Sequence, residues 1–345
     1  MPLISANVAG LLESESLDDL QEAIQQAIAL EHATIPPYLF ALYSIGASNL
    51  PAYIRLKRIV RDEMLHMLLA CNILNAIGGK PRIAAADFVP RYPAPLPGTV
   101  AGGLQVPLAR YSMELVEQVF MELERPETPL RFPFGEAAAP PLTIGRFYGK
   151  LKERLRACAF DNQGRRQVTS QMFAEILPED RQRIVDYPSA VGAIDHIVTQ
   201  GEGTPDSPLA GAGPYAHYYQ LAELANGRAL VVNPVAGPST PPRHRYHYAG
   251  DLLPFDAAGV VPFRTNPRSD QYCDGSAART AVEKCKRSYS AILSQLQKAV
   301  DGQPAAIHAA IEAMRLDFRV SVEALKALPL EEDGTRPAPC FEFVP

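Results

Sequence analysis

Two glutamates on the apolar faces of two predicted helices restrict the possible folds of this chain more than any other feature. The first helix is predicted to begin near Ser16, and Glu31 falls on its apolar stripe. The second is predicted to begin near Pro51, and its apolar face carries Glu63 and, three residues later, His66. An ionised carboxylate on a buried face is strongly destabilising unless it is paired, protonated or bound to a metal. The two helices must therefore enclose a partner for these acids.

The short connection between these helices predicts an antiparallel pair, which would bring the acids together. A lone Glu on one helix and Glu-x-x-His on its neighbour can converge inside a bundle, as in di-iron and di-manganese carboxylate proteins. Carboxylate oxygens can bridge and neutralise two divalent ions, and an imidazole supplies a terminal ligand. The alternative for the two glutamates is a buried salt bridge with Arg58 or Arg61.

A complete di-metal site needs a second set of ligands, and this chain has no second Glu-x-x-His motif. The candidates are Glu124 at the end of a third predicted helix, Glu202 at the end of a fourth, and His217 in a fifth. Glu124 has an alternative role as a helix cap or as the partner of the neighbouring arginine. In that case Glu117 or Glu122 would be the substitute ligand.

The remaining histidines have less specific surroundings in the sequence. We interpret His32, His196 and His308 as surface or core residues. His244 and His247 lie in a loop that also carries arginine and tyrosine, from which they could face a substrate.

The rest of the chain predicts a mainly α fold with long loops, because its 32 prolines are spread through the middle of the sequence. Pro36 and Pro37 are expected to kink or interrupt the first helix. Residues 143–158 fit either a strand or a helix, and residues 165–176 could pair with them. Further helices are predicted at 108–124, 189–201, 215–224, 277–300 and 304–328.

We therefore expect three parts along the chain. Residues 1–230 form a helical bundle that holds the candidate site, and residues 231–276 form an extended region rich in proline and aromatic residues. Residues 277–345 form a C-terminal helical hairpin that packs on the bundle.

Charge and composition make several classes of partner unfavourable. The chain has 33 Lys plus Arg against 38 Asp plus Glu and no basic block, which argues against nucleic acid or an anionic membrane as a partner. The first twenty residues contain four acids and no base, unlike a secretory signal, and no segment reads as a membrane span. The five cysteines form no CxxC pair and fit reduced thiols. We expect a cytoplasmic protein that binds a small molecule. The sequence leaves open whether the chain forms a homo-oligomer.

Several of these segments resemble a known family. LEHATIPPYL (30–39), DEMLHM (62–67) and LNAIGGKP (74–81) are similar to the ferritin-like domain at the start of the iminophenylpyruvate dimer synthase of violacein biosynthesis. LERPE (123–127), QGEGT (200–204) and HYY (217–219) resemble later signature segments of that family, and the resemblance covers roughly residues 15–230. It implies a ferritin-like bundle with metal ligands at the following positions: Glu31, Glu63 and His66, completed by Glu202 and His217, with Glu124 as a further candidate.

The first functional hypothesis that follows is a ferritin-like di-metal carboxylate oxidoreductase of secondary metabolism, which acts with O₂ or peroxide on a small organic substrate. Its cofactor would be two divalent transition-metal ions, most simply iron, with manganese as the alternative. The second hypothesis is a non-catalytic protein that binds metal or handles iron. The third is a metal-free helical scaffold whose inward carboxylates pair with arginines. Metal content separates the third hypothesis from the others, and O₂ consumption that depends on an organic compound separates the first from the second.

Overall fold

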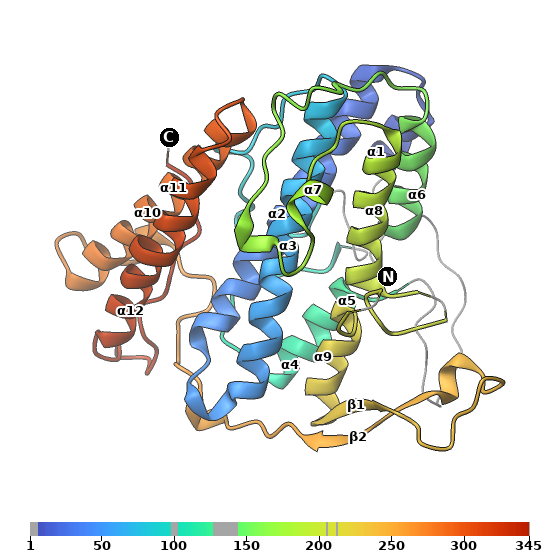
Figure 1. Cartoon of the computed structure of the whole chain (residues 1–345). Coiled ribbons are helices and arrows are strands. Elements are labelled where there is room, and N and C mark those ends of the chain that lie inside the picture. Colours follow the sequence, from blue (N-terminus) through green and yellow to red (C-terminus); the bar gives the residue numbers. More distant parts are fainter. Residues whose placement is uncertain (1–5, 98–102, 127–143, 205, 212, 345) are drawn as a thin grey trace.

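Two long helices form the centre of the molecule, and the other helices pack around them (Figure 1). The computed structural model describes all residues except 1–5, 98–102, 127–143, 205, 212 and 345. The fold is mainly α, as predicted. The described helices are α1 (Ala6–Glu13), α2 (Leu17–Ser44), α3 (Leu50–Ala76), α4 (Met113–Leu115), α5 (Met121–Leu123), α6 (Ile144–Leu155), α7 (Glu179–Gln182), α8 (Tyr187–Glu202), α9 (His217–Asn226), α10 (Ala277–Val300), α11 (Ala306–Ala313) and α12 (Arg319–Ala327).

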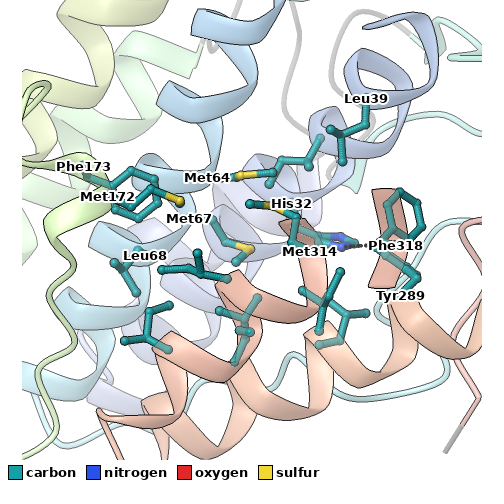
Figure 2. Close-up of a pocket in the computed structure, with 17 residues that line it drawn as sticks. His32, Leu39, Met64, Met67, Leu68, Met172, Phe173, Tyr289, Met314 and Phe318 are labelled. Atoms are coloured by element: carbon teal, nitrogen blue, oxygen red, sulfur yellow. Dashed lines mark hydrogen bonds between the residues drawn. The ribbon is translucent and has the colours of Figure 1, made fainter. Parts of the chain in front are cut away.

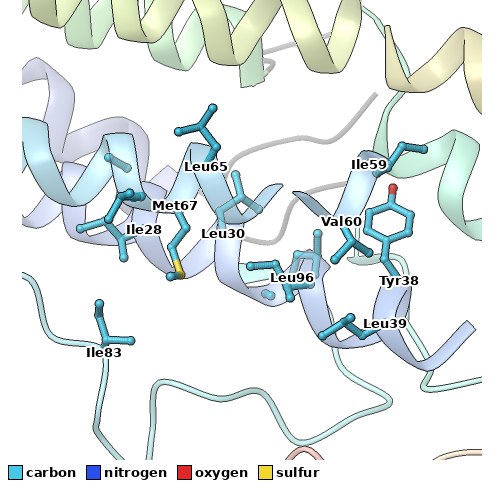
Figure 3. Close-up of a cluster of buried hydrophobic side chains, with 14 of the residues drawn as sticks. Ile28, Leu30, Tyr38, Leu39, Ile59, Val60, Leu65, Met67, Ile83 and Leu96 are labelled. Carbon is cyan, nitrogen blue, oxygen red and sulfur yellow. The ribbon is translucent and has the colours of Figure 1, made fainter. Parts of the chain in front are cut away.

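Helices α2 and α3 are the central pair, joined by the short 3₁₀ turn η1 (Ala47–Asn49). The Ser16 side chain caps α2 by accepting a hydrogen bond from the backbone N–H of Asp19, which confirms the predicted start. Buried apolar side chains from both helices, among them Ile28 and Val60, pack together and fix the relative positions of the two helices (Figure 3). The polar side chains on these helices are therefore held on a rigid base.

Pro36 and Pro37 were predicted to kink or interrupt the first helix, and the interruption is wrong, because α2 continues through both residues. Pro37 cannot donate the backbone hydrogen bond that the carbonyl of Ala33 would normally accept. The hydroxyl of Tyr92 donates to that carbonyl instead, at 2.7 Å. A hydroxyl from a distant loop thus compensates for a proline inside the helix.

The third predicted helix begins five residues later than expected, at Met113. It consists of α4, the π-helical turn η4 (Val116–Phe120) and α5. The preceding segment is extended because the backbone N–H and C=O of Leu108 both bond to Asn266, at 2.8 Å each. Ser112 then caps α4 by accepting from the N–H of Leu115.

The segment left open between strand and helix is helical and forms α6. It does not pair with residues 165–176, in which the described secondary structure is the 3₁₀ turn η5 (Gln171–Phe173). The region predicted to be extended, residues 231–276, contains most of a two-stranded antiparallel hairpin. Its strands are β1 (Arg228–Val232) and β2 (Tyr246–Leu252), with Val231 opposite His247. The short helix α1 was not predicted from the sequence.

The C-terminal helices form a second pair, with α10 on one side and α11, the π-helical turn η9 (Met314–Phe318) and α12 on the other. They lie on one side of α2 and α3, whereas α6 and α8 lie on the other (Figure 1). One continuous cluster of buried apolar side chains runs from α2 and α3 into α10 and α12. In the described part of the chain, no helix is long and apolar enough to cross a membrane.

Candidate metal centre

The first three predicted site residues converge between α2 and α3. Glu31 projects from α2, and Glu63 and His66 project from α3 towards it. The Nδ1 atom of His66 lies 3.5 Å from Oε2 of Glu31 and 3.6 Å from Oε1 of Glu63. All three side chains are buried, and one ligand atom from each lies within 4.8 Å of the others. This is a suitable arrangement for one divalent ion.

A second group shares Glu63 with the first. His217, the first residue of α9, places its Nδ1 atom 3.1 Å from Oε1 of Glu63 and 3.4 Å from Oε2 of Glu124. Glu124 follows the last residue of α5, and these three side chains are also buried within 4.8 Å of one another. The same Glu63 oxygen therefore faces both imidazoles, so the two groups are adjacent and joined by one carboxylate.

Glu202, the sixth predicted residue, lies at the last position of α8 and belongs to neither group among the described residues. It lines the same cavity of about 50 Å³ that Glu31, Glu63, His66 and Glu124 line. A Cβ atom built on Gly145 of α6 would lie 3.2 Å from Oε2 of Glu202, so the carboxylate is close to α6. The structure thus places Glu202 in the wall of the cavity.

A hydroxyl group holds each of the three buried carboxylates by one oxygen and leaves the other oxygen facing a histidine. Two of these hydroxyls come from α2, at three and seven residues after Glu31, and the third comes from α6. None of these three hydroxyl groups was predicted from the sequence to belong to the site. The hydrogen bonds run from Tyr148 to Oε1 of Glu31, from Thr34 to Oε2 of Glu63 at 2.7 Å, and from Tyr38 to Oε1 of Glu124 at 2.6 Å.

The two imidazoles are oriented in the same way. Nε2 of His66 lies 2.8 Å from Oε1 of Gln200, and Nε2 of His217 lies 3.2 Å from Oδ2 of Asp62. An N–H at Nε2 that donates to these oxygens leaves the Nδ1 lone pair directed at the carboxylates, as metal binding requires. Nδ1 of His217 is buried and faces two carboxylates, those of Glu63 and Glu124. The donor set therefore fits metal ions.

The charges in the metal-free centre are balanced by protons on the histidines. Burial favours a neutral imidazole, but hydrogen bonds with Glu31 and Glu63 raise the pKa of His66 to about 10. Burial also opposes a charge on His217, yet the charge of Glu124 and hydrogen bonds with the surrounding carboxylates raise its pKa well above the ordinary value. Burial opposes ionisation of Glu63, but hydrogen bonds from the two histidines lower its pKa. A metal ion would have to displace these histidine protons.

The salt-bridge alternative for the two central glutamates is wrong. Neither Glu31 nor Glu63 pairs with an arginine in the described part of the chain. Arg61 instead donates to the carbonyl of Met172 at 2.8 Å and lies 3.6 Å from Glu175. In the described residues, the side chains that pair with or donate to these two acids are those of His66, His217, Thr34 and Tyr148.

Of the alternative roles considered for Glu124, the helix cap agrees with the structure, because Glu124 is the C-cap residue of α5, whereas the arginine pair does not. Arg125 pairs with Glu122 and not with Glu124. Glu117 is exposed to solvent, and neither it nor Glu122 belongs to the two ligand groups. Of the acids considered at this end of the third helix, only Glu124 faces the centre.

The other histidines lie outside the two groups among the described residues. His32 is buried with its Nε2 atom 2.7 Å from the hydroxyl of Tyr289, and His308 is exposed. His196 is the nearest, with its ring centroid 6.3 Å from that of His66. The structure places His244 in the turn η6 (Pro242–His244) and His247 in β2.

Replacing Gln200 with leucine is expected to lower metal affinity by about 10- to 100-fold, because His66 loses the acceptor that orients its ring. Competition titration with a chromophoric chelator measures this change. Gln171→Leu is the matched control, since that glutamine is exposed in η5. Equal affinities of the Gln200→Leu variant and the wild type would contradict a ligand role for His66.

Comparisons with known proteins give one family model and one similar curated protein. The model of the family described as Ferritin-like matches residues 24–226. Dichlorochromopyrrolate synthase from Lentzea aerocolonigenes is 24% identical over 389 aligned positions, which cover 94% of this chain and 36% of that protein. The chain therefore spans about a third of the length of this curated relative.

A solved structure shows the same fold. It is the crystal structure of a ferritin-like protein from Caulobacter vibrioides, with a TM-score of 0.60 and 22% sequence identity. The match covers 94% of this chain and 99% of that one. The likeness therefore extends beyond the central bundle and includes most of the C-terminal helices.

Proposed function

Because this chain belongs to the ferritin-like family, we propose that it is a di-metal carboxylate oxidoreductase of secondary metabolism that acts with O₂ or peroxide on a small organic substrate. The observation that carries this proposal is the pair of buried ligand groups that share one oxygen of Glu63. The 24% identity to a synthase of a small organic compound supports an enzymatic role.

Each group supplies the ligands of one ion in this proposal. Glu31 and His66 hold the first ion, Glu124 and His217 hold the second, and Glu63 lies between them. Iron is the simplest choice and manganese is the alternative, because carboxylate and imidazole ligands suit both metals. When bound, a pair of ferrous ions supplies electrons for the activation of O₂. Glu202 is a further ligand from the wall of the cavity.

The protein provides a preorganised and largely apolar environment for the metal ligands. The three hydroxyl donors hold the carboxylates in place, so little reorganisation is needed when metal binds. The cavity beside the ligands is otherwise lined mainly by aliphatic side chains, which exclude water from the reacting groups. These side chains are Leu30, Leu96, Leu123, Ile197 and Val198.

Stepwise loading with iron distinguishes the proposed oxidoreductase from a protein that only handles iron. Protein loaded anaerobically with ferrous iron is expected to bind two ions per chain, to react with O₂ once, and to take up no further iron in later additions. Continued O₂ consumption should require an added organic compound. Iron uptake far beyond two ions per chain would favour an iron-handling protein, and no uptake would favour the metal-free scaffold.

Metal affinity is expected to rise with pH. His66, with a pKa of about 10, is protonated at neutral pH in the metal-free protein and must lose that proton before Nδ1 can bind an ion. For each proton that metal binding releases, the apparent metal affinity rises by up to about tenfold for each unit that the pH increases below the pKa. Manganese titrations at pH 6, 7 and 8, in buffers of different ionisation enthalpy, measure both affinity and proton release. Affinity that does not change with pH would contradict this charge state.

A further inference from the structure

A second cavity lies on the side of α2 and α3 that faces the C-terminal helices (Figure 2). It has a volume of about 70 Å³ and is lined by side chains of α2, α3, α10, α11 and η9, with two more from η5. Methionines from three separate segments contribute to its walls, and the others are mainly leucine and isoleucine. The four methionines are Met64, Met67, Met172 and Met314. The metal centre, by contrast, faces α8 on the other side of the pair.

This cavity has few polar groups that could hold water. His32 and Tyr289 supply its polar side-chain atoms, and they bond to each other, with Nε2 of His32 2.7 Å from the tyrosine hydroxyl. The remaining ring nitrogen, Nδ1 of His32, is buried and has no partner among the described residues. An ordered water usually needs two to four polar partners, so the cavity is expected to be dry.

The cavity and the metal centre are separated by the thickness of the same two helices. His32 directly follows Glu31, and Met64 directly follows Glu63. Met67 likewise directly follows His66. Since a helix with its side chains is about 10 Å across, a small molecule in the cavity lies within about one helix diameter of the candidate ligands.

We propose that this cavity binds a small apolar gas, and that O₂ collects there before it reaches the metal centre. The second part rests on the proposed function. A volume of about 70 Å³ exceeds the roughly 30 Å³ of one water in the liquid but is about half of a cavity that holds benzene. A dry apolar space of this size suits a diatomic molecule, and transfer of such a molecule from water to apolar surroundings is favourable.

Xenon binding to the metal-free protein tests the gas site independently of the metal. Ala310 is buried in the cavity wall on α11, so Ala310→Leu is expected to fill the cavity and abolish binding. Ala309→Leu is the matched control, because Ala309 is exposed on the same helix. Wild-type protein and the control should bind one xenon atom in the cavity, seen in crystals under xenon pressure. Absence of xenon from the wild type, or equal binding by Ala310→Leu, would overturn the proposal.

A second variant keeps the xenon test informative if the Ala310→Leu variant does not fold. Met314→Ala removes side-chain atoms from the wall and is expected to increase xenon affinity several-fold. Unchanged xenon affinity in this variant would overturn the assignment of the cavity.

Ferrous-loaded protein tests the role of the cavity in O₂ supply. At low O₂ concentration, iron oxidation in Ala310→Leu should be several-fold slower than in Ala309→Leu, and the two rates should converge at saturating O₂. Equal rates at every O₂ concentration would overturn this role. If the wild type binds xenon but no iron, the proposed function fails while the gas site stands.

Discussion

Glu63→Ala is expected to remove nearly all bound metal while leaving the helices in place. The Oε1 atom of Glu63 faces both His66 and His217, so this single change takes a ligand from both ion positions. Alanine is the residue best suited to a helix interior, so α3 should persist. Metal analysis after anaerobic loading, together with circular dichroism, measures the two effects.

The control for this variant is Glu175→Ala. That carboxylate is 85% exposed and lies near Arg61, so its loss removes an equal charge without touching the centre. It should retain two ions per chain. If Glu63→Ala also retained full metal occupancy, the assignment of Glu63 as the shared ligand would be wrong.

Glu31→Gln and Glu124→Gln are each expected to reduce the metal content from two ions per chain to one. Each glutamate belongs to only one of the two groups, and an amide is a much weaker ligand than a carboxylate. Glutamine keeps the size of the side chain and an oxygen that can accept from Tyr148 or Tyr38, which protects the local structure. Metal analysis of the two single variants and the double variant checks this, and the double variant should bind none.

The two single variants also separate a di-metal centre from a single site with surplus carboxylates. Retention of both ions by either variant would show that its glutamate is not essential to its group. Loss of both ions from a single substitution would show that the two positions do not bind independently.

The first group could be predicted from the sequence because its geometry is local. Helical spacing alone puts Glu31 on the buried face of α2 and places Glu63 and His66 on one side of α3. The short connection then brings the two helices together. Thr34 and Tyr38 follow Glu31 at helical spacing, so a signal for these two hydroxyl donors was present in the same stripe.

The second group could be identified only as a set of candidates, because tertiary packing positions it. Glu124 comes just after a helix that contains a π-helical turn, and His217 begins a short helix after a loop. A shift of one residue at such ends turns a side chain away from the centre. Tyr148 lies in a segment whose pattern fitted strand and helix equally, so its role had no sequence signal.

The errors in the predicted fold have a similar cause, since each depends on a contact between distant segments. The unbroken α2 depends on the hydroxyl of Tyr92, and the late start of α4 depends on Asn266. The strand β1 begins after a single residue, Gly227, that follows α9, and it is only five residues long, so its sequence pattern is too short to predict a hairpin. Local propensity cannot anticipate partners supplied by other parts of the chain.

Anomalous X-ray diffraction from crystals loaded anaerobically with ferrous iron tests the central claim most directly. The two-group arrangement predicts two iron peaks per chain, one beside Glu31 and His66 and the other beside Glu124 and His217, with Glu63 next to both. A single peak, a peak elsewhere, or no peak at these residues would contradict a di-metal centre.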